Sequence, residues 1–448
     1  LINLFHLNPD DITNIVCTTF NKMMVLLVTL ADKHQACPYC GFTAPKIKEY
    51  VTKEITHSAL TTQKCIIKYR ARRYKCPCCG KTYYEFNPFV FKSQKISILT
   101  VHNILKDLKD FNETFTSVAR RYHVSPTSVS TIFDNHVDIG RNPLPEIINF
   151  DEVYAFKSEK SKYVCVLLDF KKQIPVDVLP NRKKEYLLNY FQKIPLEERK
   201  KVKYACSDMY EVYRDVVHKV FPEAKHLLDY FHLSQDFHKK MNEVRIKVMK
   251  GYKDNKASDE YYLLKKFNWL LFKNPEDEDK HGRLFDVERE RKYNSHFKSY
   301  MNYYDLRKKL LEINNDLTIC YSLKLELVDF YSKSTIDNAK VNLEILIRSF
   351  IDTNIEEMIK FSNNLINWKQ EIINSFTIVG AEYKVEADKG QVVVCNKKVN
   401  NAIIENRNKI IKCIKNNANG YTNWLRFRNR VMYVLDPNAT FSLEPKEK

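Results

Sequence analysis

Two pairs of cysteines have the spacing of a metal site. Cys37 and Cys40 form the first pair, Cys76 and Cys79 form the second, and a glycine directly follows each pair. A tight CxxC turn can direct two sulfur atoms at one ion, and four thiolates suit tetrahedral zinc. Buried or redox-active cysteines are the alternative interpretation. Because the two pairs match each other, we predict that the four cysteines bind one structural Zn²⁺.

Three carboxylates are candidates for a different metal chemistry. Asp151 lies in a strand-like segment, Asp208 ends another, and Glu405 is the only acid between Lys389 and Arg430. Divalent ions held by such acids can activate water or a 3′-hydroxyl for displacement at a phosphodiester. Oxygen ligands suit Mg²⁺ or Mn²⁺. Surface carboxylates without a function are the alternative, because the chain contains 55 acidic residues.

The elements that would position these acids begin after Pro145, where the pattern becomes mixed. The expected strands are 147–156, 163–170, 174–179, 202–207 and 224–228, and the expected helices are 184–192 and 209–220. Three strands followed by alternating helices and strands are typical of an α/β unit, which would bring Asp151 and Asp208 together. Residues 231 to about 375 have helical periodicity with no strand signal, and residues 399–433 return to helix.

A helix-turn-helix is predicted in residues 116–133. Its apolar residues would pack inward, and Ser125 would cap a second helix that has Pro126 at its first position. That helix exposes short polar side chains that can enter a major groove. They are Thr127, Ser128, Ser130 and Thr131. An ordinary helical hairpin is the alternative for so short a pattern.

The charge of the chain favours a polyanionic partner. The net charge is +18, from 73 Lys and Arg against 55 Asp and Glu. Residues 64–81 are basic and contain two tyrosines and no acid. A solvated basic face is the alternative, but phosphate contact is favoured beside a zinc site and a helix-turn-helix. The arginines expected to contact DNA are Arg70, Arg72, Arg73, Arg120 and Arg121.

Several other function classes are excluded. The eight glycines are at least ten residues apart, so neither a phosphate loop nor a dinucleotide-binding turn can be formed. The sequence contains no HExxH zinc-protease motif and no GxSxG nucleophile elbow. The apolar run 23–31 is far shorter than the ~20 residues of a membrane-spanning helix, so we expect no membrane partner.

The motifs around these acids resemble those of the ISL3 family of DDE transposases, which bacterial insertion sequences encode. The similarity covers about residues 37–433. It is carried by Asp151-Glu152, Ser207-Asp208-Met209-Tyr210, Asp229-Tyr230-Phe231-His232 and the stretch 401–412. The resemblance implies that Asp151, Asp208 and Glu405 are the catalytic acids and hold two Mg²⁺ or Mn²⁺ ions per active site. Asp229 and His232 also match the family, with a structural or a catalytic role.

The resemblance also implies an architecture. We expect a multidomain chain with a small zinc ribbon, an all-α helix-turn-helix, and an α/β ribonuclease-H-like catalytic core that carries a large all-α insertion. The expected parts are an N-terminal segment 1–36, the zinc ribbon 37–91, the helix-turn-helix 92–140, the first part of the core 147–230, the insertion 231–390 and the last part of the core 391–435. Within that last part, the residues expected to contact DNA are Arg407, Lys409 and Lys412.

The function expected from this resemblance is DNA transposition. The protein would bind the inverted repeat ends of its insertion sequence, cleave the strand and join the freed 3′-hydroxyl to target DNA. Its partner would be double-stranded DNA, and a homodimer or larger assembly is expected because two ends must be handled together. We expect a cytoplasmic, nucleoid-associated protein of a bacterium. The alternative is a zinc and helix-turn-helix DNA-binding regulator that derives from a transposase and has an inactive nuclease-like domain.

Overall fold

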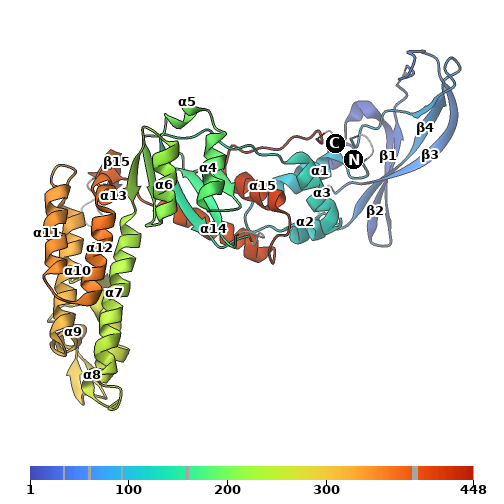
Figure 1. Cartoon of the computed structure of the whole chain (residues 1–448). Helices are drawn as coiled ribbons and strands as arrows, with labels where there is room; N and C mark the ends of the chain where they lie inside the picture. The colour runs from blue at the N-terminus through green and yellow to red at the C-terminus, as the bar shows by residue number, and fades with distance from the viewer. Residues whose placement is uncertain (34–35, 59–61, 92–93, 157–160, 386–391, 447–448) are drawn as a thin grey trace.

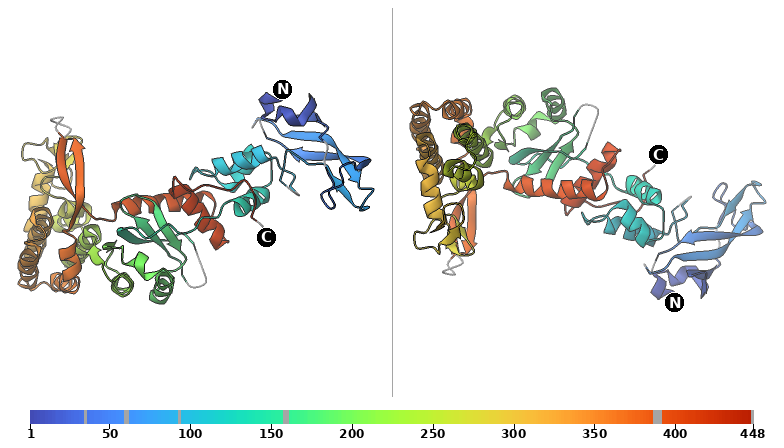
Figure 2. Two further views of the ribbon diagram at one scale, coloured as in Figure 1. Left: turned by 90° about the horizontal axis from the view of Figure 1, so that it is seen from above. Right: turned by 90° about the horizontal axis from the view of Figure 1, so that it is seen from below.

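The computed structural model describes residues 1–448 except 34–35, 59–61, 92–93, 157–160, 386–391 and 447–448. The molecule is elongated (Figure 1). An N-terminal sheet lies at one end, followed by three small helices, a mixed α/β unit and a helical bundle at the other end. The two views of Figure 2 show the same succession from above and from below.

The N-terminal sheet contains five strands. They are β1 (Ile12–Phe20), β2 (Met23–Leu30), β3 (Lys46–Thr56), β4 (Cys65–Lys75) and β5 (Thr82–Tyr84). The order is β1-β2-β4-β3, and β5 pairs with the end of β4. Two short 3-10 helices, η1 (Asn3–Phe5) and η2 (Pro9–Asp11), precede β1.

The first 36 residues, which we expected to form an N-terminal segment of their own, contribute two strands to this sheet. Strands β1 and β2 form a hairpin, and β2 pairs with β4 from Met24↔Cys65 to Val28↔Tyr69. The hairpin turns at Asn21 and Lys22, whose φ angles are 49° and 61°. Positive φ at both positions is the requirement of a type I′ turn, which here contains no glycine. A boundary at residue 36 would therefore divide strands of one sheet.

Three helices follow, and the second and third of them span the residues 116–133 in which a helix-turn-helix is expected. They are α1 (Ile98–Asp107), α2 (Phe115–Arg121) and α3 (Pro126–His136). Helix α3 begins as predicted, because the side chain of Ser125 accepts a hydrogen bond from the backbone N–H of Ser128 and Pro126 is the first residue. Val129 and Ile132 are buried between the helices.

The mixed sheet confirms the predicted order of strands and helices. Its strands are β6 (Ile147–Val153), β7 (Val164–Asp169), β8 (Pro175–Leu179), β9 (Tyr204–Ser207) and β10 (Lys225–Leu228). They lie in the order β10-β9-β6-β7-β8. Strands β6, β7 and β8 are antiparallel neighbours, whereas β9 runs parallel to β6 and β10 parallel to β9.

Helices cover both faces of this sheet (Figure 2). One face packs on α4 (Lys184–Gln192) and α6 (Glu211–Val220), and the short α5 (Leu196–Arg199) lies between them in sequence. The other face packs on α14 (Ala402–Asn417) and α15 (Trp424–Leu435). Burial on both faces explains why the strands read as continuous apolar runs. Residues from the far end of the chain thus complete the unit that Ile147 begins.

The segment between β10 and α14 is a helical bundle with its own apolar core. Its helices are α7 (Tyr230–Lys250), α8 (Asp259–Lys266), η3 (Asn268–Phe272), α9 (Tyr303–Glu312), α10 (Asn315–Lys333), α11 (Ala339–Ile351), α12 (Glu356–Asn367) and α13 (Lys369–Asn374). None of the described helices is both long enough and apolar enough to cross a membrane.

The expectation of an all-α insertion was wrong. Two hairpins lie within residues 231–390: β11 (Glu278–Asp279) with β12 (Gly282–Arg283), and β13 (Lys292–Asn294) with β14 (Ser299–Met301). A further strand of this segment, β15 (Ile378–Val385), pairs with β16 (Val392–Lys398) just beyond it. The first two hairpins contain strands of only two or three residues, which is too short for an alternating pattern to be visible in the sequence.

Candidate functional site

Three aspartates lie in one row at the carboxyl edge of the mixed sheet. Strand β6 pairs with β9 from Ile147↔Tyr204 to Asn149↔Cys206, and extending this register by two residues sets Asp151 opposite Asp208. Strand β10 pairs with β9 up to Leu228↔Ser207, so the next residue, Asp229, lies opposite Asp208. Neighbouring parallel strands end at one edge of a sheet, where α/β proteins bind their ligands. The structure therefore brings Asp151 and Asp208 together, as predicted.

Asp151 is buried and constrained at both oxygens. The residue is 8% exposed, and its Oδ1 accepts a hydrogen bond of 2.7 Å from the backbone N–H of Glu152. Its Oδ2 accepts one of 2.7 Å from Nδ2 of Asn408 on α14. Burial is the main reason that the pKa of Asp151 rises to about 7. The hydrogen bond from the Glu152 N–H lowers this pKa, whereas the negative charge of Asp208 raises it.

Asp208 follows β9, and its carboxylate has fewer hydrogen-bond partners than that of Asp151. Burial is also the main reason that the pKa of Asp208 rises to about 6, and the charge of Glu152 adds to it. Its Oδ1 is buried and has no hydrogen-bond partner among the described residues. An orphaned carboxylate oxygen beside a second carboxylate is an arrangement that a bound cation would relieve.

Helix α14 brings Glu405 to the same edge. Its start is held against the sheet, because Nδ2 of Asn149 donates to Oδ1 of Asn401 at 2.7 Å and the N–H of Asn401 donates to Asp229 at 3.2 Å. The ligand atoms of Glu405, Asp229 and His232 all lie within 4.8 Å of one another. In this structure Glu405, the third predicted acid, therefore clusters with Asp229 and His232, which follow β10.

His232 connects this cluster to the row of aspartates. Its Nδ1–H donates to Oδ2 of Asp229 at 3.0 Å. Burial lowers the pKa of His232, but the Asp229 hydrogen bond and the charges of Asp229, Asp208 and Asp151 outweigh burial and raise it above the ordinary value. A carboxylate that holds one ring nitrogen leaves the other free for a ligand, as around metal-binding histidines.

The donors at this edge fit a divalent cation. They combine carboxylate oxygens with one imidazole, and the orphaned Oδ1 of Asp208 offers an unused lone pair. Carboxylates suit Mg²⁺ and Mn²⁺, and histidine is the commonest side-chain ligand of metals in general. Asp151, Asp208 and Glu405 could hold such ions.

The four predicted zinc ligands converge in a second cluster, on the N-terminal sheet. The Sγ atoms of Cys37 and Cys79 lie 3.7 Å apart, and those of Cys40 and Cys76 lie 3.5 Å apart. Sulfurs at the corners of a tetrahedron with 2.3 Å zinc bonds would be about 3.8 Å apart. The backbone N–H of Cys79 lowers the pKa of Cys76 to about 7, although burial opposes it. The set fits a zinc ion.

Comparison with known proteins shows the family to which the chain belongs. Residues 148–386, more than half of the chain, match the family of ISL3-type DDE transposases, described as "Transposase". The chain belongs to the ISL3 family of DDE transposases. The matched residues include Asp151, Asp208, Asp229 and His232, and they end before Glu405.

One curated protein is similar to this transposase in sequence. It is the transposase for insertion sequence element IS1001 of Bordetella parapertussis, which is 20% identical over 250 residues. The match covers 55% of this chain and 61% of that relative. The chain thus spans about three fifths of the length of the curated relative that it matches.

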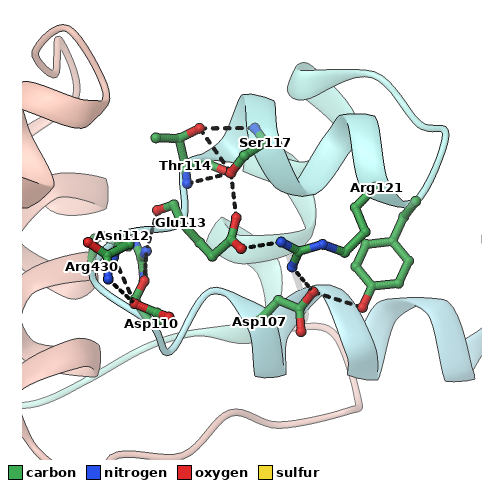
Figure 3. A network of polar contacts seen from close by, with 9 residues as sticks. Asp107, Asp110, Asn112, Glu113, Thr114, Ser117, Arg121 and Arg430 are labelled. Atoms are coloured by element: carbon green, nitrogen blue, oxygen red, sulfur yellow. Dashed lines mark hydrogen bonds and ion pairs between the residues drawn. The ribbon is translucent and has the colours of Figure 1, made fainter. Parts of the chain in front are cut away.

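Several basic residues that were predicted to contact DNA form internal contacts in this transposase. Arg72 pairs with Glu85, with an Nη1–Oε2 distance of 2.8 Å, and Arg73 pairs with Glu49 at 2.7 Å. Arg121 bridges Asp107 and Glu113, and Arg407 donates to the backbone carbonyl of Gln173 (Figure 3 shows the Arg121 pairs). These contacts give the four arginines a role within the fold. Contact of these arginines with phosphate stays a prediction.

Other predicted DNA-contact residues are open to a partner. The exposed ones are Arg70, Arg120, Thr127, Thr131, Lys409 and Lys412. Arg70 lies over the ring of Tyr50, with its guanidinium carbon 4.9 Å from the ring centre. On α3, Ser128 and Ser130 are half-buried, and their hydroxyls contact Ser125 and the carbonyl of Thr127. Thr127 and Thr131 therefore form the exposed part of the predicted recognition surface.

Asn408 is a site residue that sequence reasoning missed. It follows Glu405 by three residues, so helical spacing places both side chains on one face of α14. That spacing was the available signal. Asp229 was already marked by the family resemblance, and the structure adds that it follows β10 as Asp208 follows β9, so that the parallel neighbours align the two.

We predict that Asp151→Asn stabilises the metal-free transposase at pH 8. The folded-state pKa of about 7 exceeds the unfolded value of ~3.9, so the stabilising contribution of the proton is complete below pH ~4 and is lost as pH rises through 7. The neutral amide avoids this loss, which is worth roughly 2–4 kcal/mol at pH 8. Asn408 can flip its amide, because its buried Oδ1 has no partner among the described residues and could accept from the new side chain.

Denaturant unfolding with EDTA at pH 8 and pH 4 tests this prediction. The gain should be present at pH 8 and small at pH 4. Equal destabilisation at both pH values would show that burial of the charged carboxylate does not govern the stability of this edge.

Proposed function

We propose that this transposase binds the inverted repeat ends of its insertion sequence and catalyses metal-dependent strand cleavage and strand transfer. The observation that carries the proposal is the alignment of Asp151 with Asp208 on parallel neighbouring strands, with Glu405 brought to the same edge by α14. Such acids are the ligands that phosphodiester chemistry with two divalent ions requires.

The topology of the mixed sheet supports a ribonuclease-H-like core. Three antiparallel strands come first in the chain, and two parallel strands extend the sheet beside the first of them. We assign residues 147–230 and 391–435 to this core and 231–390 to its insertion. The helix-turn-helix would lie within 92–140, and the zinc-binding part within 37–91, joined to the strands of 12–30.

The roles of the chain's own residues follow from their contacts. Asp151, Asp208 and Glu405 would hold Mg²⁺ or Mn²⁺, which when bound activate the attacking oxygen and stabilise the leaving one. Asn408 holds the Asp151 carboxylate in place, and Asp229 orients the ring of His232. DNA would be the substrate, and a dimer or larger assembly would hold two ends together.

The test is cleavage of labelled DNA by the purified protein. The substrate is a duplex that carries the terminal inverted repeat found beside the coding frame, and the reaction contains Mg²⁺ or Mn²⁺. The proposal expects nicks in one strand at the end of the repeat, which disappear when EDTA is added. Specific binding without cleavage under all metal conditions would support the regulator instead.

We further predict that one surface, on α3, determines which DNA sequence is bound, whereas another, on β4, contributes affinity for any DNA duplex. Thr131→Ala on α3 should change the relative affinity for altered end sequences, because short side chains in the groove read base edges. Arg70→Gln on β4 should weaken binding to all duplexes alike and reduce the salt dependence by about one charge. Competition binding with altered end sequences measures both. Equal effects of the two substitutions would contradict the assignment of α3.

A further inference from the structure

A polar crevice lies between the helix-turn-helix and the catalytic core. Its volume is about 360 Å³, and α2 lines it on one side while the loop between α14 and α15 lines it on the other. The exposed polar lining residues are Thr116, Arg120, Asn417, Asn419, Thr422 and Asn423. None of the described lining residues carries a carboxylate. The crevice therefore offers hydroxyls, amides and positive charge.

The walls of the crevice are held together by buried contacts. Arg430 of α15 is 1% exposed, and its Nη2 donates to the backbone carbonyls of Asp110 and Glu113 at 2.8 and 2.7 Å. Figure 3 shows this side chain reaching the turn that precedes α2. The rings of Phe115 and Tyr421 meet edge to face with centres 6.3 Å apart. The crevice is thus preformed.

Nearby negative charges are already paired, which leaves Arg120 available. The Glu113 carboxylate binds Arg121 and accepts from the Ser117 hydroxyl. Asp134 is bound by Arg426, with an Nε–Oδ1 distance of 2.9 Å. No described residue forms an ion pair with Arg120, which is exposed. Its guanidinium has the geometry to contact a phosphate.

An exposed stripe on α14 leads from the acids to this crevice. Glu405, Lys409, Lys412 and Asn416 succeed one another at spacings of three or four residues and so lie along one face of the helix. The two lysines and Asn416 are exposed. At 1.5 Å per residue the stripe is about 17 Å long, and the crevice begins at its end.

We propose that this stripe and the crevice form a binding surface for the sugar–phosphate backbone of duplex DNA. The inference rests on the proposed function and adds the path by which DNA held by the helix-turn-helix reaches the acids. A length of about 17 Å corresponds to about five base pairs at 3.4 Å each. From Lys409 onward the stripe carries positive charge and a neutral amide, and none of the described residues that line the crevice carries a carboxylate, so this part of the surface favours phosphate oxygens and no particular base.

Asn423→Asp tests the crevice with little risk to folding. The Asn423 side chain caps α15 by accepting from the N–H of Arg426 at 2.9 Å, and Asp is an equally good cap at a helix N-terminus. The substitution therefore keeps the cap and places one negative charge in the crevice. Asn314→Asp is the matched control, because the Asn314 side chain also caps a helix, α10 of the helical bundle, by accepting from the N–H of Asp316 at 2.7 Å.

Affinity for an end duplex and for an unrelated duplex of equal length is measured for both full-length variants across a salt series. Asn423→Asp and Arg120→Gln should weaken binding of both duplexes several-fold, and Arg120→Gln should reduce the salt slope by about one. Asn314→Asp should bind like the unsubstituted protein. Thermal unfolding checks that the variants fold.

The outcomes separate this inference from the proposed function. If the unsubstituted protein cleaves ends while Asn423→Asp and Arg120→Gln bind unchanged, the backbone surface is overturned and the transposase function stands. If both variants lose affinity although the unsubstituted protein never cleaves, the surface stands and the catalytic proposal fails. Equal weakening by Asn314→Asp would also overturn the surface, because the effect would then follow from charge alone.

Discussion

Asp208→Asn should reduce strand cleavage and strand transfer by several orders of magnitude and leave binding of DNA ends intact. The substitution keeps the size of the side chain but removes the negative charge that a hard divalent ion requires. The Oδ1 of Asp208 is buried without a hydrogen-bond partner among the described residues, so no existing contact there competes with a cation for this carboxylate. End binding should survive because the predicted recognition residues lie on α3.

Asp151→Asn and Glu405→Gln should have the same effect, and a double substitution should add little. Residues that act as one unit are not additive in their kinetic effects. Single-turnover cleavage of end-labelled duplex measures the chemical step, and a gel-shift titration measures binding separately. Activity should fall in each variant without a loss of affinity for the end duplex.

Asp169→Asn is the matched control for this series. Asp169 also ends a strand of the mixed sheet, but it pairs with Ile148 at the start of β6 and so lies at the opposite edge. Its Oδ1 accepts from the N–H groups of Lys171 and Lys172 at 2.9 and 3.0 Å, which the amide oxygen of Asn can also do. Normal cleavage by Glu405→Gln would contradict the assignment of the third acid, and Asp229 would be the next residue to test.

The α/β unit was predictable because its strands are short apolar runs. The apolar runs placed Asp151 within one strand and Asp208 at the end of another, and the order of strands and helices indicated one sheet. What the sequence could not provide is the register that aligns the two residues. Nor could periodicity show that Asn401 of a distant helix would bind Asn149 and Asp229 and so hold Glu405 at the same edge.

The pairing of arginines could not be predicted, because it depends on contacts between strands and helices. Arg72 and Glu85 are 13 residues apart and meet because β5 and the residue after it turn back along β4. Arg121 meets Asp107 only because α1, α2 and α3 share one apolar core. A basic run in a sequence therefore shows how much charge is present, whereas the fold decides which side chains stay available for phosphate.

Loss of zinc should unfold the part of the N-terminal sheet around the four cysteines. The apolar cluster there is small and consists of Cys37, Cys76, Tyr74 and Tyr83, with Cys79 partly buried against it. With so little apolar area to bury, binding energy of about 10–16 kcal/mol from a structural zinc would be the main source of stability. Metal analysis should find one zinc per chain.

Cys76→Ser should lose the zinc, whereas Cys78→Ser should keep it. Cys78 lies in the same turn but is exposed and outside the cluster, so it controls for the chemical change. Hydrogen exchange should increase in β5 and the adjoining end of β4 in Cys76→Ser, while the core around Leu26 and Ile67 should keep its protection. DNA affinity should also fall, because Arg70 is carried by β4. A zinc-free protein with protected β5, or a Cys76→Ser variant with unchanged exchange and DNA affinity, would show that the four thiols are packed side chains and not ligands.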